Sequence, residues 1–255
     1  MIDMHCHILP NVDDGANTLI DSLEMARWAV AEGIHTIIAT PHHKNGKYVN
    51  ERAEVIYKVE RLNDELQRQN IPLKVLPGQE VRLYGNLLEE YESGKVMTLN
   101  GTNKYMLIEF PANHIPHYAE QLLYELKLKR ITPVIAHPER NAEFRERPDK
   151  LYDIVKKGAL TQVTAGSLIG KFGREINKFS LQLVEHNLTH VIASDAHNTT
   201  TRGFNLNKAY ERIQEEFGAN VMHGLKGAPA LLISGQSIVK YEANRIQRKK
   251  LFGIF

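Results

Sequence analysis

The segment Met1-Ile2-Asp3-Met4-His5-Cys6-His7 opens the chain and determines how the rest of it is interpreted. It has the pattern of a first β-strand that ends in two histidines one residue apart. Residues i and i+2 of a strand point to the same face, so both imidazoles can reach one metal ion. Short apolar runs recur downstream, and residues with metal-ligand chemistry follow them. These further candidate ligands are Asp14, His42, Glu80, Glu109, His137, Asp195 and His197.

The order of the apolar runs predicts parallel βα units, because short β-branched runs alternate with longer amphipathic segments. Strands are predicted at 2–7, 36–40, 73–77, 105–110, 132–136, 160–164 and 190–194, and helices at 18–32, 50–69, 119–129, 173–187 and 206–217. This α/β pattern predicts a distorted (β/α)7 barrel, similar to a TIM barrel. The candidate ligands lie at or just past the C-terminal ends of the strands, where such barrels carry their active sites.

Length and charge limit the classes of protein that fit. A barrel of 255 residues commonly has one core, so a single domain over 1–240 is predicted. The tail 241–255 is basic first and then apolar. It is expected to dock a partner, to approach anionic lipid or to be an ordinary chain end. The chain has 32 basic and 30 acidic residues, a formal charge of +2, which argues against a general nucleic-acid binder.

Cysteine content and apolar runs indicate the compartment. Cys6 is the only cysteine, so no intramolecular disulfide can form and a reducing compartment is expected. A thiol phosphatase of the Cys-x5-Arg type would need arginine at position 12, where this chain has Val12. A strand that begins at residue 2 leaves no room for a signal peptide, and no long apolar stretch predicts stable membrane insertion. The cytoplasm is the predicted location.

Several short motifs occur together in this chain. They are His5-Cys6-His7, Asp13-Asp14-Gly15, Ala39-Thr40-Pro41-His42-His43, Pro77-Gly78-Gln79-Glu80, Ile108-Glu109-Phe110, Ala136-His137-Pro138-Glu139-Arg140 and Ala193-Ser194-Asp195-Ala196-His197. The set resembles the polymerase and histidinol phosphatase (PHP) superfamily and, within it, the CpsB/YwqE-type bacterial tyrosine-protein phosphatases. The resemblance covers essentially the whole chain and implies a PHP-type barrel that hydrolyses phosphotyrosine. The implied substrate is the C-terminal tail of a bacterial tyrosine kinase that controls capsular or exopolysaccharide synthesis.

The resemblance also implies three divalent metal ions. His5, His7, Glu80 and Asp195 would hold the first ion, and Glu80 would bridge to a second that Glu109 and His137 complete. Asp14, His42 and His197 would hold the third. Manganese is the usual ion of the family, and mixed imidazole and carboxylate ligands also suit iron or zinc. Four carboxylates and three divalent ions leave a charge of about +2, which a hydroxide and a phosphate dianion would nearly neutralise.

The remaining candidates are positively charged or titratable side chains near the ligands. Arg140 and Arg202 follow His137 and His197 in the sequence, and a guanidinium group binds phosphate with two donors, so both are candidate phosphate clamps. His43 is a candidate general acid, with a structural role as the alternative. The expected nucleophile is a water activated by the ions, so no phosphoenzyme is required.

Three other functions stay open at this point. A small-molecule phosphatase such as histidinol phosphatase could use the same residues, and a metal-dependent nuclease is a weaker alternative because a basic, aromatic-rich stripe is missing. A non-catalytic adaptor that binds phosphotyrosine is the third. The oligomeric state is also open, and a homo-oligomer is compatible with the sequence.

Overall fold

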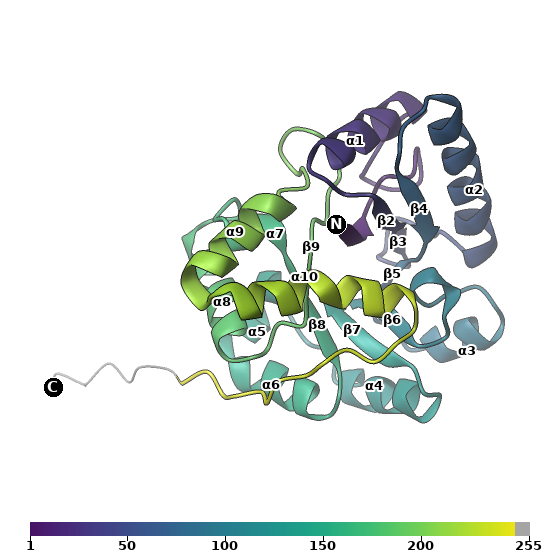
Figure 1. The fold of residues 1–255 in the computed structure, drawn as a ribbon. Coiled ribbons are helices and arrows are strands. Elements are labelled where there is room, and N and C mark those ends of the chain that lie inside the picture. Colours follow the sequence, from purple (N-terminus) through teal and green to yellow (C-terminus); the bar gives the residue numbers. More distant parts are fainter. Residues whose placement is uncertain (248–255) are drawn as a thin grey trace, which may run out of the picture.

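The computed structural model describes residues 1–247 and combines two parallel β-sheets with surrounding α-helices (Figure 1). The three-stranded sheet has the order β1 (Ile2–Cys6), β2 (Thr36–Ala39), β4 (Lys74–Pro77). The six-stranded sheet has the order β3 (His42–His43), β5 (Glu80–Arg82), β6 (Tyr105–Glu109), β7 (Thr132–Ala136), β8 (Leu160–Thr164), β9 (Val191–Ala193). All neighbouring strands pair in parallel, so the prediction of parallel βα units is confirmed.

Two chain connections and one short bridge link the two sheets. The chain passes from β2 to β3 through a step that contains Pro41, and from β4 to β5 through a step that contains Gly78. Proline has no N–H group for a ladder hydrogen bond. A Cβ atom at Gly78 would lie 2.7 Å from Cγ2 of Ile38, so only glycine fits there. On the other side, Cys6 at the end of β1 forms a parallel bridge with Ala196.

The seven predicted strands are present, with ends that shift by one residue at most. The short strands β3 and β5 are not among them. Both follow interruptions that break the apolar pattern, and each has only two or three residues, so periodicity cannot identify them. They are nevertheless important, because they carry two candidate ligands, His42 and Glu80.

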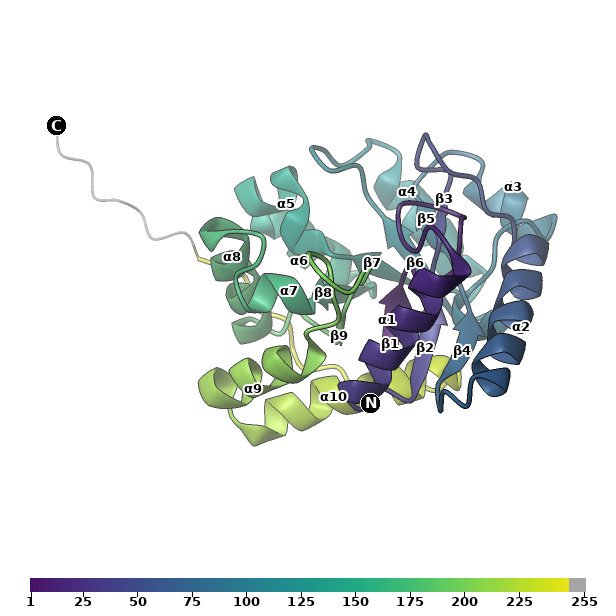
Figure 2. The same cartoon turned by 90° about the horizontal axis from the view of Figure 1, so that it is seen from above.

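The five predicted helices are present as α1 (Leu19–Ala31), α2 (Arg52–Arg68), α4 (Ala119–Leu128), α8 (Arg174–Glu185) and α9 (Leu206–Phe217). The structure adds α3 (Leu87–Glu92), α5 (Ala142–Glu146), α6 (Pro148–Lys156), α7 (Ala165–Leu168), α10 (Ala219–Ile233) and the 3₁₀ turns η1 (Leu99–Gly101) and η2 (Pro138–Arg140). Helix α10 contains Gly224, Gly227 and Pro229, which weaken a helical pattern. It packs against α9, β1 and β9, beside the N-terminus (Figure 2).

Apolar packing connects the two sheets. One buried cluster contains Met4 and Ile38 from the three-stranded sheet together with Leu107, Val134 and Leu160 from the six-stranded sheet. A second cluster fills the space between strands and helices, as expected when helices cover a parallel sheet. The sheets are therefore parts of one packed core.

The chain after α10 continues without helix or strand to the end of the described part. Ala243 and Ile246 are buried, so the first residues of the predicted tail pack on the folded body. The basic and apolar segment 248–255 lies outside the described residues. In the part that the structure describes, every helix is too short or too polar to span a lipid bilayer.

Buried His190 should make folding stability depend on pH. Its Nδ1 accepts a hydrogen bond from the Thr161 N–H at 3.1 Å. Burial, and then the charge of Lys240, lower the pKa of His190 from 6.5 to about 4. Between these values the unfolded chain binds a proton that the folded chain does not, so this residue should remove up to about 3 kcal/mol of stability as the pH falls from 6.5 to 4.

The measurement is the free energy of unfolding in denaturant at several pH values, for the original chain and for His190→Gln. The variant should lose less stability than the original chain between pH 6.5 and 4. Equal slopes would contradict the assignment of this pH dependence to His190.

Candidate metal centre

A cavity of about 370 Å³ lies at the C-terminal ends of strands from the six-stranded sheet. Most of the predicted site residues line it, and His5, His7 and His197 adjoin these from the protein interior. The lining residues are Asp14, His42, Asn45, Glu80, Arg82, Glu109, Phe110, Ala112, Ala136, His137, Arg140, Asn141, Phe144, Asp195 and Arg202.

The first cluster of candidate ligands consists of His5, His7, Glu80 and Asp195, all of them buried. Nε2 of His5 lies 3.3 Å from Oε2 of Glu80 and 3.4 Å from Oδ1 of Asp195. Nε2 of His7 lies 3.3 Å from each of the same two oxygens. Both imidazoles point to one face because they are two residues apart at the end of β1. These four side chains are the ones that the resemblance assigns to the first ion.

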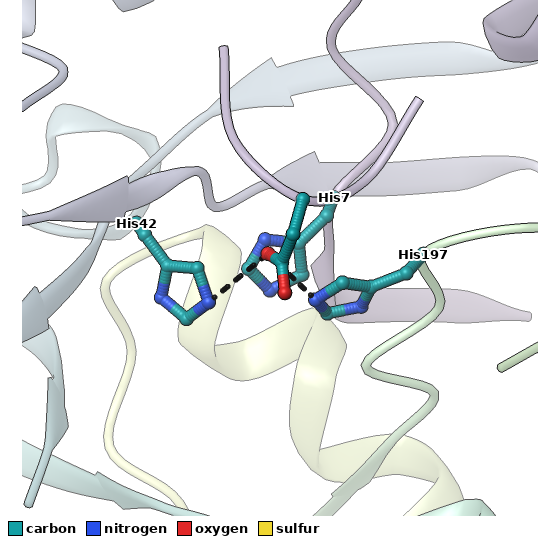
Figure 3. A group of neighbouring side chains, drawn as sticks. His7, His42 and His197 are labelled. Carbon is teal, nitrogen blue, oxygen red and sulfur yellow. Dashed lines mark ion pairs between the residues drawn. The ribbon is translucent and has the colours of Figure 1, made fainter. Parts of the chain in front are cut away.

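The second cluster consists of His7, Asp14, His42 and His197. Oδ1 of Asp14 lies 3.4 Å from Nε2 of His42 and 3.3 Å from Nε2 of His197. Figure 3 shows these two histidines approaching the same carboxylate from different sides, with His7 close by. Asp14 is the most accessible member, with 44% of its side chain exposed. The cluster contains all three residues that the resemblance assigns to the third ion.

The third cluster consists of His42, Glu80 and Glu109. Nδ1 of His42 lies 3.0 Å from Oε2 of Glu80 and 3.7 Å from Oε2 of Glu109. The two ring nitrogens of His42 therefore face two different clusters. His137, which the resemblance groups with Glu80 and Glu109, lies with its Nε2 2.6 Å from Oε1 of Glu80.

Two candidate ligands have an uncommon backbone conformation. His137 follows β7 with φ of 33°, and Asp195 follows β9 with φ of 52°. Both angles lie in the left-handed region, which side chains other than glycine rarely adopt. Such residues gather at functional sites, where the surrounding structure compensates for the strain. Here the turns end the strands and allow both side chains to line the cavity.

Two further polar residues orient the histidines of β1. Nδ1 of His5 donates to Oε1 of Gln162 at 2.8 Å, and Nδ1 of His7 donates to Oδ2 of Asp13 at 2.7 Å. These bonds leave Nε2 of each ring free to act as a ligand. Asp13 also accepts from the backbone N–H groups of Gly15 and His42, at 3.0 Å each. Neither Asp13 nor Gln162 is among the predicted site residues, although Asp13 adjoins the candidate ligand Asp14.

Three arginines line the cavity. Nη2 of Arg140 and Nη2 of Arg202 both contact Oδ2 of Asp195, the second at 3.0 Å. Arg82 instead contacts Glu109, with 3.1 Å between Nη2 and Oε2. Arg82 is not predicted from the sequence. Its position two residues after Glu80 on one strand is the signal that could have identified it.

His43 does not line the cavity. Its Nδ1 donates to the carbonyl oxygen of Asn50 at 2.8 Å, and its Nε2 lies 3.5 Å from Oε2 of Glu90. Successive residues of a strand point to opposite faces, so the orientation of His42 toward the clusters turns His43 away from them.

The donor atoms of the clusters fit divalent cations. Several of these buried atoms have no hydrogen-bond partner, namely His42 Nδ1, Glu80 Oε2, Glu109 Oε2, Asp195 Oδ1 and His197 Nε2. Buried polar atoms are normally satisfied, and a metal ion would satisfy all of these. Imidazole nitrogen and carboxylate oxygen together suit manganese, iron or zinc.

The pKa values of two candidate ligands, His137 and His197, also favour metal binding. Burial and then Arg140 lower the pKa of His137 to about 4, and burial and then His7 lower the pKa of His197 to about 4. Both rings are therefore neutral at pH 7 and can act as ligands. Burial would lower the pKa of His42, but the charge of Glu80 and the contacts with Asp14 and Glu80 together outweigh it and raise this pKa to about 10. Metal binding at His42 would therefore release a proton.

Known proteins are similar to this chain in sequence and in fold. The family model for capsular polysaccharide synthesis, CpsB/CapC, matches residues 1–230. The tyrosine-protein phosphatase YwqE of Bacillus subtilis (strain 168) is 52% identical over 255 residues, and the putative tyrosine-protein phosphatase CapC of Staphylococcus aureus is 36% identical over 255 residues. Both alignments cover 100% of each chain.

A solved structure gives the same relationship in three dimensions. It comes from work on YwqE from Bacillus subtilis and CpsB from Streptococcus pneumoniae, described as unique metal-dependent tyrosine phosphatases. It matches with a TM-score of 0.95 and 52% identity, and the match covers 97% of this chain and 100% of that one.

Proposed function

Because the chain belongs to the CpsB/CapC family of capsular polysaccharide synthesis, we propose that it is a metal-dependent tyrosine-protein phosphatase. The observation that carries the proposal is the cavity, where unpartnered imidazole and carboxylate atoms face arginine side chains. The clusters offer sites for cations, and the arginines offer donors for an anion. Hydrolysis of a phosphate monoester needs both the cations and the donors.

The proposed metal ligands are the nine predicted ones: His5, His7, Asp14, His42, Glu80, Glu109, His137, Asp195 and His197. We propose three ions, with manganese as the native metal. Bound at these residues, the ions would supply Lewis acidity and an activated water. The three clusters support the number three, and His42, with one nitrogen toward each of two clusters, is proposed to contribute to both.

Arginine and phenylalanine side chains of the cavity would bind the substrate. Arg140 and Arg202 are proposed to donate to the phosphoryl oxygens and to stabilise charge that develops on them. Phe110 lines the same cavity and offers an apolar surface to the phenyl ring, and the completely buried Phe144 packs edge-on against Phe110. A phenolate is only a moderately basic leaving group, so a general acid is not indispensable. For His43 we propose a structural role, because it contacts Asn50 and Glu90.

We propose that the two sheets form a distorted (β/α)7 barrel of the PHP type within one domain over 1–240. The Cys6 to Ala196 bridge and the passage of β2 into β3 and β4 into β5 support it, because they continue the strand order around the molecule. Residues 241–255 are proposed to be a C-terminal tail.

The proposed substrate is the phosphorylated C-terminal tail of a tyrosine kinase that controls capsular or exopolysaccharide synthesis, in the cytoplasm. The family description and the names of the relatives support this choice. A flexible tail can present its phosphotyrosine to a cavity without unfolding a domain.

The test is phosphate release by manganese-loaded protein from a tyrosine-phosphorylated kinase-tail peptide. Phosphoserine peptide, histidinol phosphate and a chelator-treated sample are compared in the same experiment. We expect strong turnover of the tyrosine peptide that the chelator abolishes. Preference for histidinol phosphate would overturn the substrate, and tight peptide binding without turnover of any substrate would favour a non-catalytic adaptor.

A further inference from the structure

Arg82 holds a position that the mechanism above does not use. It lies two residues after Glu80 on β5 and therefore on the same face of the strand. Its Nη2 is 3.1 Å from Oε2 of Glu109, and its Nη1 donates to the carbonyl oxygen of Phe110 at 3.4 Å. One guanidinium group thus contacts both the carboxylate of Glu109 and the backbone directly after it.

The backbone of Glu109 is held from the same strand. Arg82 and Glu109 occupy paired positions on the neighbouring strands β5 and β6. The N–H of Leu83 donates to the carbonyl oxygen of Glu109 at 2.9 Å. Side chain and backbone of Glu109 are therefore both fixed by contacts from residues 82 and 83, which leaves this carboxylate little freedom to turn.

The charges around Glu109 explain why it needs such a contact. Its Oε2 converges with Oε2 of Glu80 on Nδ1 of His42. Two carboxylates this close repel each other in a protein interior, and a cation beside them reduces the repulsion. Arg82 is suitably placed, since only 22% of its side chain is exposed. Arg140 and Arg202, by contrast, contact Asp195.

The ion pair leaves Glu109 able to bind a metal. Its Oε2 has no hydrogen bond of acceptable geometry, although Arg82 lies beside it. Nδ1 of His42 and Oε2 of Glu80 likewise have no hydrogen-bond partner. Three ligand atoms without a hydrogen-bond partner thus face one another, and Nη2 of Arg82 lies 3.1 Å from one of them, Oε2 of Glu109.

We propose that Arg82 is a positioning residue, which holds the Glu109 carboxylate toward His42 and Glu80 and thereby sets how tightly this cluster binds its cation. The inference rests on the proposed metal-dependent function. Arg82 acts through Glu109 and does not contact the substrate. Loss of a residue that orients a metal ligand typically weakens metal binding by about 10–100-fold.

The test compares Arg82→Gln, Arg82→Lys and the control Lys44→Gln in the full chain. Lys44 also carries a positive charge near the site, but its Nζ pairs with Oε1 of Glu90 at 2.9 Å. Metal-free protein is titrated with Mn²⁺ by calorimetry, and metal content is measured after gel filtration. Circular dichroism and thermal unfolding check that each variant is folded.

We expect Arg82→Gln to weaken the binding of one Mn²⁺ by about 10–100-fold and to retain about one ion fewer per chain. Arg82→Lys should restore part of the affinity, because an ammonium group can pair with Glu109 but lacks the planar fork that also reaches Phe110. Lys44→Gln should bind manganese like the original chain. Combining Arg82→Gln with Glu109→Gln should add little to the loss from Glu109→Gln alone.

Two results would overturn the proposal. The first concerns Arg82 alone, and the second concerns the metal centre as a whole. If Arg82→Gln binds manganese normally but its KM for the phosphotyrosine peptide rises, Arg82 contacts substrate instead of positioning Glu109. If the original chain binds no manganese, the metal centre itself is wrong and the role of Arg82 falls with it. If the Arg82→Gln variant does not fold, the Arg82→Lys variant decides the question. An Arg82→Lys variant that binds Mn²⁺ as tightly as the original chain would contradict the proposal.

Discussion

Glu80→Gln should lower kcat/KM for a phosphotyrosine peptide by about 10³-fold, which corresponds to roughly 4 kcal/mol of lost transition-state stabilisation. Glu80 is completely buried and belongs to two of the three ligand clusters. Its carboxylate contacts the candidate ligands His5, His7, His42 and His137. Glutamine keeps the shape but removes the charge and one of the two oxygens. Phosphate release and metal content per chain are the measurements, and both should fall.

Glu139→Gln is the matched control for this variant. Glu139 is also completely buried, but its Oε1 accepts from the Thr164 N–H at 3.0 Å and from the Ser167 hydroxyl at 2.7 Å. Burial raises the pKa of Glu139, so a neutral amide is a mild replacement. This variant should keep its metal and most of its activity. Equal losses in both variants would mean that any change to a buried glutamate damages the fold, and would contradict the special role of Glu80.

Arg140→Gln and Arg202→Gln should each lower kcat/KM by about 10–100-fold, the effect of losing a hydrogen bond to a charged group. Phosphate should inhibit both variants less strongly. The double variant should lose less than the product of the two effects, because both side chains contact the same oxygen of Asp195. Lysine at either position should restore only part of the activity, since it lacks the planar fork.

Arg145→Gln serves as the control for the two arginine variants. Arg145 lies in α5, where its Nη1 donates to the carbonyl oxygen of Glu139 at 3.2 Å, and it does not line the cavity. The Arg145→Gln variant should have an activity near that of the original chain. If Arg140→Gln instead lost metal while KM and phosphate inhibition stayed unchanged, Arg140 would act on the ligand Asp195 and not on the phosphate.

The strand pattern predicted much of the architecture, because parallel strands with buried faces have a strong apolar signal. It could not predict β3 and β5, which are short and follow Pro41 and Gly78. Helix α10 was also not predicted, since its glycines and its proline weaken the helical pattern, while its contacts with α9, β1 and β9 are set by the fold. Whether the sheets close into the predicted barrel stays a proposal.

The site could be predicted as a group of residues more easily than as a set of contacts. The strand ends identified side chains such as His5 and Asp195, which do converge. The two-sided position of His42 depends on its ring orientation, which no motif specifies. His43 shows the opposite problem, because closeness in sequence suggested a role in the cavity while strand alternation turns its side chain away.

The division of the strands into two sheets has a consequence for the lifetime of the protein. The first cluster takes His5 and His7 from the end of the three-stranded sheet, and Glu80 and Asp195 from strands of the six-stranded sheet or the turn after them. A cation held there would add a further link between two sheets that already meet through apolar packing, hydrogen bonds, a short bridge and two chain connections. Its binding energy would add to the stability of the folded chain. A cell short of the metal would then lose the enzyme itself to proteolysis, as well as its activity.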